Sequence, residues 1–384
     1  MSPLQLGFAC VWNRDGNREQ TWSHTPMHLW RAIERRGDVV IHDIPVQIPR
    51  FVDLICRTLS MRLVEGRPWS TWALRPTFAR IAHTALKNSI AKAGPLDAIL
   101  DIGEQGSVDV PLYIYQDHCF GHGIELYHQT GYLPHGWSGV GLAELKRRAQ
   151  MQAQSYATCA GVFTMSQWNA DYLIRSGLLD PSRVHVVHAG INVPVEPPTA
   201  ELLDVKRSRS VRTILFVGRE FHRKGGDLVV AAFEIAKRSS SRPLRLIIAG
   251  PRNWPLQGDI QEGVEFIGEA SFEILREQMR NADVVVMPSR FEAFGIVFIE
   301  ALAAGTPVIG RRAFAMSEFI KHGQNGMLIE NDDPSALAEA MLAVVEDEGI
   351  ALYCNREANH VALYYSWDRV AADIVDVITS QIHR

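Results

Sequence analysis

Residues 287–309 read MPSRFEAFGIVFIEALAAGTPVI and hold the clearest pattern in the chain. An apolar strand is expected to end at Met287, a loop follows, and a helix is expected from Gly295 to Ala304. A short apolar run, Pro307–Ile309, then predicts the next strand. A strand, a helix and a second strand in this order are typical of a β/α unit in a parallel sheet.

The same alternation continues on both sides of this segment. The other predicted strands are Leu6–Val11, Val39–Ile44, Ala98–Ile102, Leu112–Tyr115, Gly161–Met165, Val184–Val187, Thr213–Val217, Leu244–Ala249, Val264–Ile267 and Val284–Met287. The other predicted helices are Thr25–Arg36, Ser166–Gly177, Gly226–Lys237, Phe272–Arg280, Pro334–Val345 and Trp367–Ile382. The pattern predicts an α/β fold with doubly wound parallel sheets.

The length and the linker predict two domains. The chain has 384 residues, and a domain holds roughly 100–200. Residues 193–210, VPVEPPTAELLDVKRSRS, contain three prolines and no apolar period, so we expect a linker there. The predicted domains are residues 1–192 and residues 193–366.

Composition and charge argue against several classes of protein. With 39 Lys and Arg against 43 Asp and Glu, the net charge is −4, which argues against a nucleic-acid partner. No signal peptide and no membrane-spanning run is recognisable, so we expect a cytoplasmic protein. The cysteines form no C-x-x-C motif, which argues against a disulfide framework or a zinc site. They are Cys10, Cys56, Cys119, Cys159 and Cys354.

The start of the helix in residues 287–309 is a candidate anion site. The backbone amides of Phe294, Gly295 and Ile296 are expected to be free there, at the positive end of the helix dipole. Glu292 precedes the helix and Glu300 lies inside it, in an apolar surrounding where a carboxylate needs a partner. Two carboxylates eight positions apart can hold two hydroxylated parts of one extended ligand.

A second turn carries two cations. Residues 214–227, ILFVGREFHRKGGD, place Arg219 and Lys224 between a strand and a helix, where they can neutralise a diphosphate. Such a turn is structural about as often as functional. No G-x-G-x-x-G or P-loop motif accompanies it, so a Rossmann dinucleotide site is not supported.

The C-terminal half resembles the retaining, nucleotide-sugar-dependent glycosyltransferases of family four. The resemblance rests on E-x7-E (Glu292 to Glu300), PSRFEAFG, GREFHRKGGD and the segment TMSQWNADYLIRSGLLDPSRVHVVHAGINV, and it is continuous from about residue 160. It implies the GT-B architecture, with two Rossmann-like domains and a cleft between them. It also implies that helix 367–384 returns to the N-terminal, acceptor-binding domain.

The resemblance implies a role for each charged residue. Arg219 and Lys224 would hold the donor diphosphate and stabilise it as it leaves. Glu300 would accept hydrogen bonds from the ribose hydroxyls, and Glu292 would hold hydroxyls of the donor sugar near the reacting carbon. Asp117, after the strand Leu112–Tyr115, would orient the acceptor.

Backbone groups complete the implied donor site. The amides of Phe294, Gly295 and Ile296 would contact the phosphates or the sugar. The nucleotide base would lie near Gly250–Arg252 and Phe266–Gly268.

No metal or other cofactor is expected. None of the 20 aspartates has another two positions away, so the D-x-D motif that holds a cation in other sugar transferases is absent. His118, His122 and His128 lie four and six positions apart, which does not match a metal site.

The N-terminal half departs from the family pattern. Gln116 stands where many members have His, and His118 after Asp117 is either a second acceptor residue or an ordinary loop histidine. Gly16 is the single glycine of the loop where the family has several near the donor phosphates. His24 stands where related sequences often have Gly, and it is expected to alter access.

Residues 50–92 carry eight basic and two acidic residues among apolar ones. This stretch is either a helical face packed on the sheet with solvated arginines, the more ordinary interpretation, or a peripheral contact with an anionic membrane at its inner face. The acceptor accordingly stays open among glycans, lipid-linked molecules and small molecules.

We therefore predict a metal-independent retaining transferase of carbohydrate biosynthesis, which uses a UDP- or GDP-linked sugar and a hydroxyl acceptor. Two alternatives share its architecture. A sugar-nucleotide isomerase of the 2-epimerase type would turn over without an acceptor. A sugar-nucleotide-binding subunit would bind the donor without catalysis.

Overall fold

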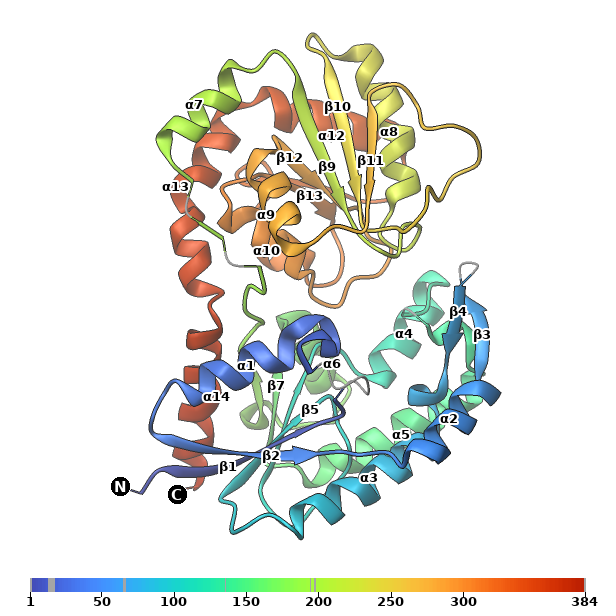
Figure 1. Ribbon diagram of the computed structural model, residues 1–384, viewed down its shortest axis with the longest axis vertical. Helices are drawn as coiled ribbons and strands as arrows, with labels where there is room; N and C mark the ends of the chain where they lie inside the picture. Colours follow the sequence, from blue (N-terminus) through green and yellow to red (C-terminus); the bar gives the residue numbers. More distant parts are fainter. Residues whose placement is uncertain are drawn as a thin grey trace. The chain divides into compact units, whose positions relative to one another are not determined.

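The computed structural model describes residues 2–12, 18–64, 67–134, 136–193, 195–196 and 198–382. The chain forms two compact units: unit 1 comprises Met1–Gly190 with Trp367–Arg384, and unit 2 comprises Ile191–Ser366. The first boundary thus lies at residues 190/191, against 192/193 in the sequence-based prediction. Each unit is an α/β body (Figure 1).

Unit 1 is built on a six-stranded parallel sheet with the order β2-β1-β5-β6-β7-β8. Its strands are β1 (Leu4–Cys10), β2 (Val39–Pro45), β5 (Ala98–Ile102), β6 (Leu112–Gln116), β7 (Gly161–Thr164) and β8 (Val184–Val186). Its helices are α1 (Thr25–Glu34), α2 (Arg50–Leu59), α3 (Pro76–Ile90), α4 (Phe120–Thr130), α5 (Leu142–Thr158), α6 (Gln167–Arg175) and α14 (Trp367–Ile382). An antiparallel hairpin, β3 (Met61–Val64) and β4 (Arg67–Ser70), follows α2.

Helix α14 belongs to unit 1 because of its apolar face. Trp367, Val370, Ile374 and Ile378 are buried, and α14 packs against α1. The ring of His28 stacks on Trp367 with their centroids 6.3 Å apart. The returning helix therefore contributes to the core of the first sheet rather than to that of the second.

Unit 2 repeats the plan with the order β11-β10-β9-β12-β13-β14, again all parallel. Its strands are β9 (Arg212–Val217), β10 (Leu244–Ala249), β11 (Val264–Gly268), β12 (Val284–Val286), β13 (Val308–Arg311) and β14 (Gly326–Ile329). Its helices are α7 (Ala200–Ser208), α8 (Gly226–Ser239), α9 (Phe272–Asn281), α10 (Ile296–Ala303), α11 (Met316–Phe319), α12 (Pro334–Glu346) and α13 (Glu348–Tyr364).

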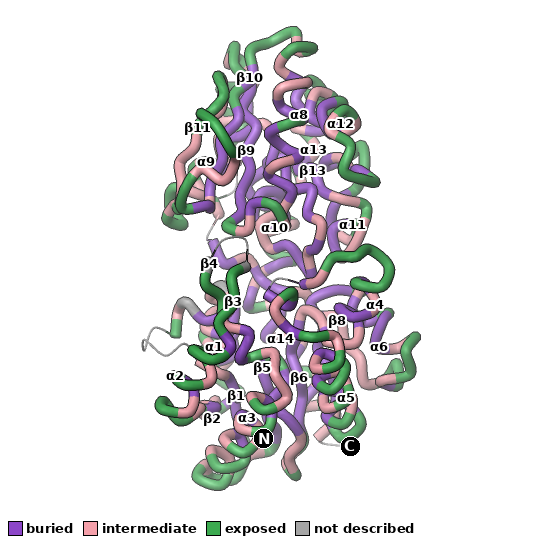
Figure 2. Tube along the Cα trace, turned by 90° about the vertical axis from the view of Figure 1, so that its right-hand side faces the viewer, coloured by how far each residue is buried: buried purple, intermediate pink, exposed green. Residues whose placement is uncertain are grey.

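The chain order reverses between β9 and β12 in unit 2, and between β1 and β5 in unit 1. Open parallel sheets bind ligands at the carboxyl ends of such neighbouring strands. The buried strands of both sheets stand out in Figure 2, whereas α2 and the β3–β4 hairpin are largely exposed. Each sheet therefore offers one switch point as a candidate site.

The expected linker is only partly irregular. Residues 200–208 form α7, whose first turn is capped by Thr199 Oγ1 accepting a hydrogen bond from the Leu202 amide. The prolines occupy the part before this helix, so the aperiodic sequence of 199–210 concealed a short capped helix.

Cys10, Cys119, Cys159 and Cys354 are buried, Cys56 on α2 is half-buried, and none of the five forms a disulfide. Within the described ranges, no helix combines the length and the apolar composition needed to cross a bilayer.

Candidate functional site

The candidate site of unit 2 is formed by the loops that follow β9 and β12, the two strands at the switch point. The loop after β9 runs through Gly218, Arg219 and Lys224 to Gly225, where α8 begins. The loop after β12 runs through Glu292 to Gly295, where α10 begins. The two motifs found in the sequence therefore come together at one edge of the sheet.

Glycines let the loops after β9, β10 and β12 approach one another. A Cβ on Gly250, which has φ +118°, would lie 2.6 Å from the Gly218 carbonyl carbon and 2.8 Å from the Arg219 nitrogen. A Cβ on Gly225, at φ +76°, would lie 2.7 Å from the Pro288 oxygen. Any side chain at these two positions would push the loops apart and would strain the backbone.

Lys224 and Glu292 form an ion pair in the site. Lys224 Nζ lies 3.2 Å from Glu292 Oε2, and Arg223 Nη1 lies 3.8 Å from the same oxygen. All three side chains are mostly buried. Arg223 was not predicted as a site residue, because the motif identifies the lysine. Its position next to Lys224 in the sequence was the available signal.

Arg219 is arranged differently from Lys224. Its side chain is exposed, and it forms no ion pair with any residue in the described part of the chain. A guanidinium without an internal carboxylate partner can turn towards an anionic ligand. Of the two predicted cations, Lys224 is thus held by an ion pair, whereas Arg219 is available to bind an anion.

Glu300 on α10 is 4% exposed. Its Oε1 accepts hydrogen bonds from the amides of Asn192 (3.2 Å) and Val193 (3.1 Å). Burial raises the pKa of this carboxyl to about 7, while the two amides and the charge of Lys224 lower it. The partner that the sequence required is therefore the backbone, and Oε2 has no hydrogen-bond partner among the residues described.

A network of arginines fixes the loop after β12. Arg290 donates from Nη1 and Nη2 to the two carboxylate oxygens of Asp227, at 2.7 and 3.0 Å, and from Nε to Asp332 Oδ2 at 2.6 Å. Arg311 also bonds Asp332, and it donates to the backbone oxygen of Ser289 at 3.0 Å. Rigid support of this kind holds site residues in one geometry.

The start of α10 offers backbone donors. Gly295 is its N-cap, with φ +94°, and the amides of Gly295 and Ile296 donate no hydrogen bond to another described residue. Phe294 is buried, with its ring centroid 5.7 Å from that of Phe319. Phe294 can therefore offer a ligand only its backbone.

The two segments expected to hold the nucleotide base lie side by side. The Gly250 amide donates to the Gly268 oxygen at 2.7 Å. Trp254 packs edge-on against Phe266, with centroids 5.7 Å apart, and its buried Nε1 lacks a hydrogen-bond partner in the described chain. Trp254 was not predicted, because the loop that carries it has no recognisable pattern.

In unit 1, Asp117 and His118 follow β6 and pair with each other. His118 Nδ1 lies 2.8 Å from Asp117 Oδ1, and both side chains are about a quarter exposed (23% and 24%). Gln116, by contrast, is buried and accepts a hydrogen bond from the Tyr156 hydroxyl at 2.9 Å. Gln116 is thus a core residue here, and the polar groups available at this strand end are Asp117 and His118.

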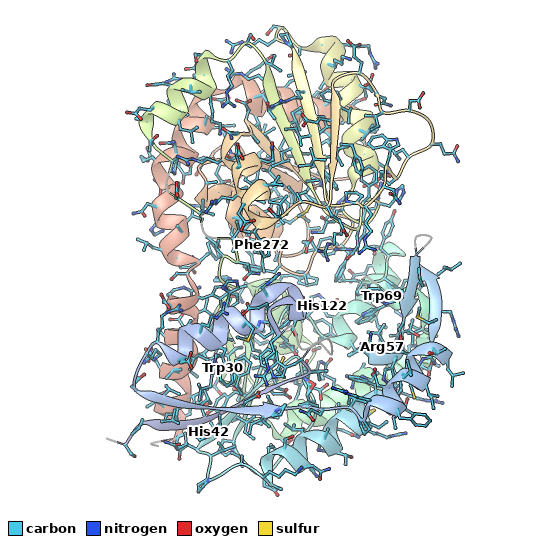
Figure 3. The ribbon with its side chains drawn as sticks, viewed as in Figure 1. Trp30, His42, Arg57, Trp69, His122 and Phe272 are labelled. Carbon is cyan, nitrogen blue, oxygen red and sulfur yellow. The ribbon has the colours of Figure 1, made fainter. Side chains whose placement is uncertain are left out.

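The remaining N-terminal candidates are spread out. Gly16 lies outside the described residues. His24 is the N-cap of α1 and adopts φ +71°, a left-handed conformation that glycine takes more easily. His122, labelled in Figure 3, is buried with its ring stacked on that of Tyr172 (centroids 4.3 Å), and desolvation lowers its pKa to about 4. No group of three His, Cys, Asp or Glu side chains that could hold a metal is found in the part of the chain that the structure describes.

Most of unit 2 matches a known protein family. Residues 204–361 match the model of the family described as glycosyl transferases group 1. An uncharacterised glycosyltransferase of Methanocaldococcus jannaschii, MJ1607, is 33% identical over 211 residues, which cover 51% of this chain and 53% of the relative. The D-inositol 3-phosphate glycosyltransferase of Jonesia denitrificans is 30% identical over 218 residues, which cover 52% of this chain and 51% of the relative. The chain thus matches about half the length of these curated relatives.

Solved structures extend the likeness to the whole chain. The sucrose-phosphate synthase of Thermosynechococcus elongatus has a TM-score of 0.70 at 18% identity, covering 99% of both chains. Anabaena HepE in complex with UDP and glucose has a TM-score of 0.60 at 14% identity, covering 98% of this chain and 100% of HepE. The chain therefore has the GT-B fold, and its residues 204–361 match the glycosyl transferases group 1 family.

Proposed function

We propose that this protein is a retaining glycosyltransferase that moves a sugar from a nucleoside-diphosphate sugar to a hydroxyl acceptor without a metal ion. The observation that carries the proposal is the set of charges at one sheet edge: the Lys224–Glu292 pair, the exposed Arg219 and the buried Glu300. The group 1 match and the UDP-bound HepE structure support a nucleotide-sugar donor of this kind.

In this proposal each group binds a different part of the donor. Arg219 and Lys224 bind the diphosphate, and the amides of Gly295 and Ile296 donate to its oxygens. Lys224 has three N–H donors, so it can keep Glu292 in place while binding a phosphate. Glu292 then faces hydroxyls of the sugar, and Oε2 of Glu300 accepts from the ribose.

The transfer step requires positive charge where the leaving group develops negative charge. The acceptor oxygen forms a bond to the anomeric carbon as the bond from that carbon to the diphosphate oxygen breaks. The acceptor proton passes to the leaving phosphate, on the same face of the sugar, so configuration is retained. Arg219 and Lys224 stabilise the departing diphosphate in this step, which is the role a metal ion has in other transferases. Asp117 orients the acceptor hydroxyl.

A thermal-shift assay in EDTA tests the donor site. UDP, GDP, ADP and NAD are added in separate wells, and we expect one diphosphate to stabilise the protein. Arg219→Ala and Glu300→Gln should abolish the shift, whereas Arg312→Ala, which breaks an exposed ion pair with Glu330 (2.6 Å), should keep it. Stabilisation by NAD alone, or by a diphosphate only after magnesium is added, contradicts the proposal.

The stereochemistry and the need for an acceptor are tested once a donor is known. NMR of the product should show the anomeric configuration of the donor, and an inverted product contradicts retention. Conversion of the nucleotide sugar into another nucleotide sugar without acceptor would identify an isomerase instead. Donor binding with neither reaction would identify a binding subunit.

A further inference from the structure

Helix α2 buries a charged side chain and exposes its apolar ones, the opposite of an ordinary surface helix. Asp53 is the one buried residue within the helix, at 1% exposure, and its Oδ1 accepts a hydrogen bond from Trp72 Nε1 at 3.0 Å. The apolar residues Phe51, Leu54, Ile55 and Leu59, which we term the outer face of α2, are exposed by 74, 64, 41 and 75%. Four large apolar side chains exposed on one helix, with the carboxylate turned inward, are typical of a surface that contacts another molecule.

The exposed apolar surface continues into the β3–β4 hairpin. Met61, Leu63 and Trp69 are exposed there, so seven of the eighteen large apolar side chains exposed in the described chain lie between residues 51 and 69. Helix α3, the other part of the basic stretch, buries Ala79, Ala82 and Leu86 instead. The packed-face interpretation of residues 50–92 is therefore correct for α3 and wrong for α2.

A pocket of about 870 Å³ lies behind α2, within unit 1. It is lined by the inner side of α2, by the hairpin and by residues that follow β1 and β2, at the carboxyl edge of the sheet. Figure 3 marks two lining residues, Arg57 on α2 and Trp69 on β4. The volume is in the range of pockets that hold small molecules, roughly 300–1,000 Å³.

The pocket lining combines cations with aromatic rings. The lining includes Arg18, Arg50 and Arg57 and one carboxylate, Asp53, which Arg57 approaches at 3.3 Å, whereas Arg18 forms an ion pair with Asp43 at 2.6 Å. Arg50 forms no ion pair with another described residue. Trp12, Trp69 and Trp72 supply flat apolar walls. Guanidinium groups bind phosphate or carboxylate, and indole rings pack on the apolar faces of polyols, so the lining suits an anionic polyol.

Charge distinguishes the partners that could cover the outer face of α2. Arg50, Arg57 and Arg62 are exposed around it, while its one acid, Asp53, is buried. A second copy of the same surface would place these cations against each other, which costs free energy. An anionic bilayer offers apolar chains to the leucines and negative headgroups to the arginines.

We propose that the outer face of α2 docks on an anionic lipid bilayer, and that the pocket behind it takes the headgroup of an anionic lipid, which is the hydroxyl acceptor. This inference rests on the proposed function and names its acceptor class. One helix then has two roles: its apolar face enters the bilayer surface, and its polar face lines the pocket that receives the headgroup.

Vesicle co-sedimentation tests the docking surface with the full-length protein. We expect strong binding to vesicles of phosphatidylcholine with phosphatidylglycerol, weak binding to phosphatidylcholine alone, and weakening by salt. The double variant Leu54→Glu/Leu59→Glu should lower vesicle affinity by roughly 100-fold, because the two leucines can then no longer bury apolar surface in the bilayer. Leu363→Glu, at an exposed leucine of α13 in unit 2, is the matched control and should bind like the wild type.

Short-chain lipids below their micellar concentration test the pocket. Short-chain phosphatidylglycerol should raise the melting temperature, short-chain phosphatidylcholine should not, and Arg50→Ala should lose the effect. Free glycerol 1-phosphate with equal affinity would show a soluble anionic acceptor and overturn the lipid part of the inference. Absence of binding to anionic vesicles, or full vesicle binding by the double variant, overturns the docking surface.

The thermal shift with donor nucleotide keeps the two proposals separate. Because the outer face of α2 is exposed, the double variant should retain its melting temperature and its response to the donor nucleotide. A nucleotide response without vesicle binding refutes this inference alone. Vesicle binding without any nucleotide response refutes the transferase and, with it, the acceptor role of the lipid.

Discussion

The two units share one sheet plan but differ at their carboxyl edges. In unit 2 the charged side chains at the edge are mostly buried and bonded to one another: Lys224 to Glu292, and Arg290 to Asp227 and Asp332. In unit 1 the corresponding edge opens into a wide pocket whose cations are largely exposed. The comparison shows that the same fold can hold the charges at its carboxyl edge in a buried network in one unit and leave them exposed around an open pocket in the other.

The largest expected effect of a substitution at either edge is on catalysis. Lys224→Ala should lower kcat/KM for transfer by roughly 1,000-fold, about 4 kcal/mol, because it removes fixed positive charge from the leaving diphosphate. Asp117→Asn, in unit 1, should lower it by roughly 100-fold, because it weakens orientation of the acceptor only. Release of the nucleoside diphosphate measures both. A greater loss in Asp117→Asn would place the main catalytic charge in unit 1.

The next largest effect is expected on stability. Arg290→Ala leaves Asp227 and Asp332 without their shared guanidinium, and we expect a loss of about 3 kcal/mol. Arg75→Ala breaks a more exposed pair with Glu144 in unit 1 (2.8 Å) and should cost about 1 kcal/mol. Urea unfolding followed by circular dichroism gives both values. Equal losses would show that the unit 2 network is no more rigid than a surface pair.

The pH dependence of unfolding should have opposite signs in the two units. The pKa of Glu300 rises on folding from 4.5 to about 7, so the folded state binds more protons between these values and stability falls as pH rises. The pKa of His122 falls on folding from 6.5 to about 4, so the unfolded state binds more protons in that window and stability rises with pH. For each group the free energy of unfolding changes by at most about 1.4 kcal/mol per pH unit.

Two variants separate these contributions. Glu300→Gln should gain stability relative to the wild type as pH rises from 4.5 to about 7. His122→Phe, which keeps the stacking on Tyr172, should lose stability relative to the wild type as pH rises from about 4 to 6.5. Melting temperatures across this range measure both, and parallel curves for wild type and variant would show that the group does not titrate as stated.

The smallest predicted effect concerns helix caps. Ser166 is buried, and its hydroxyl accepts from the Asn169 amide at 3.2 Å in unit 1, whereas Ser271 caps α9 in unit 2 from an exposed position at 3.4 Å. Ser166→Ala should cost about 1.5 kcal/mol and Ser271→Ala about 0.5 kcal/mol in unfolding free energy. Chemical unfolding resolves the difference, and the reverse order would show that burial adds nothing to the cap.

The sequence predicted most strands and the placement of the two unit 2 loops at one edge, and the resemblance to a known family implied the GT-B fold. The strands and the loops were predictable because they rest on local patterns, such as apolar runs and the glycines at 218, 225 and 295. The partner of Glu300 was not predictable, since two backbone amides more than 100 residues away supply it. The β3–β4 hairpin, β14 and α7 were missed because short elements carry little periodicity, and the longer helices α3, α5 and α13 were not predicted either.

The reversed polarity of α2 could not be derived from its sequence either. The apolar residues of an amphipathic helix normally face the core, so the pattern Phe51, Leu54, Ile55 and Leu59 favours burial. Only the tertiary contacts of Asp53 and Trp72 show which side of the helix faces inward. The predicted roles of Asp117, His118 and His24 depend on the acceptor and that of Gly16 on the donor phosphates, so all four stay predictions.

The cysteines provide a practical way to watch α2. Burial raises the pKa of the Cys119 and Cys354 thiols to about 12 and also raises that of Cys159, and Cys10 is buried as well. Since thiol reagents attack the accessible thiolate, a maleimide dye should label Cys56 first. The native chain can thus carry a single environment-sensitive fluorophore on its proposed docking helix, without an engineered cysteine.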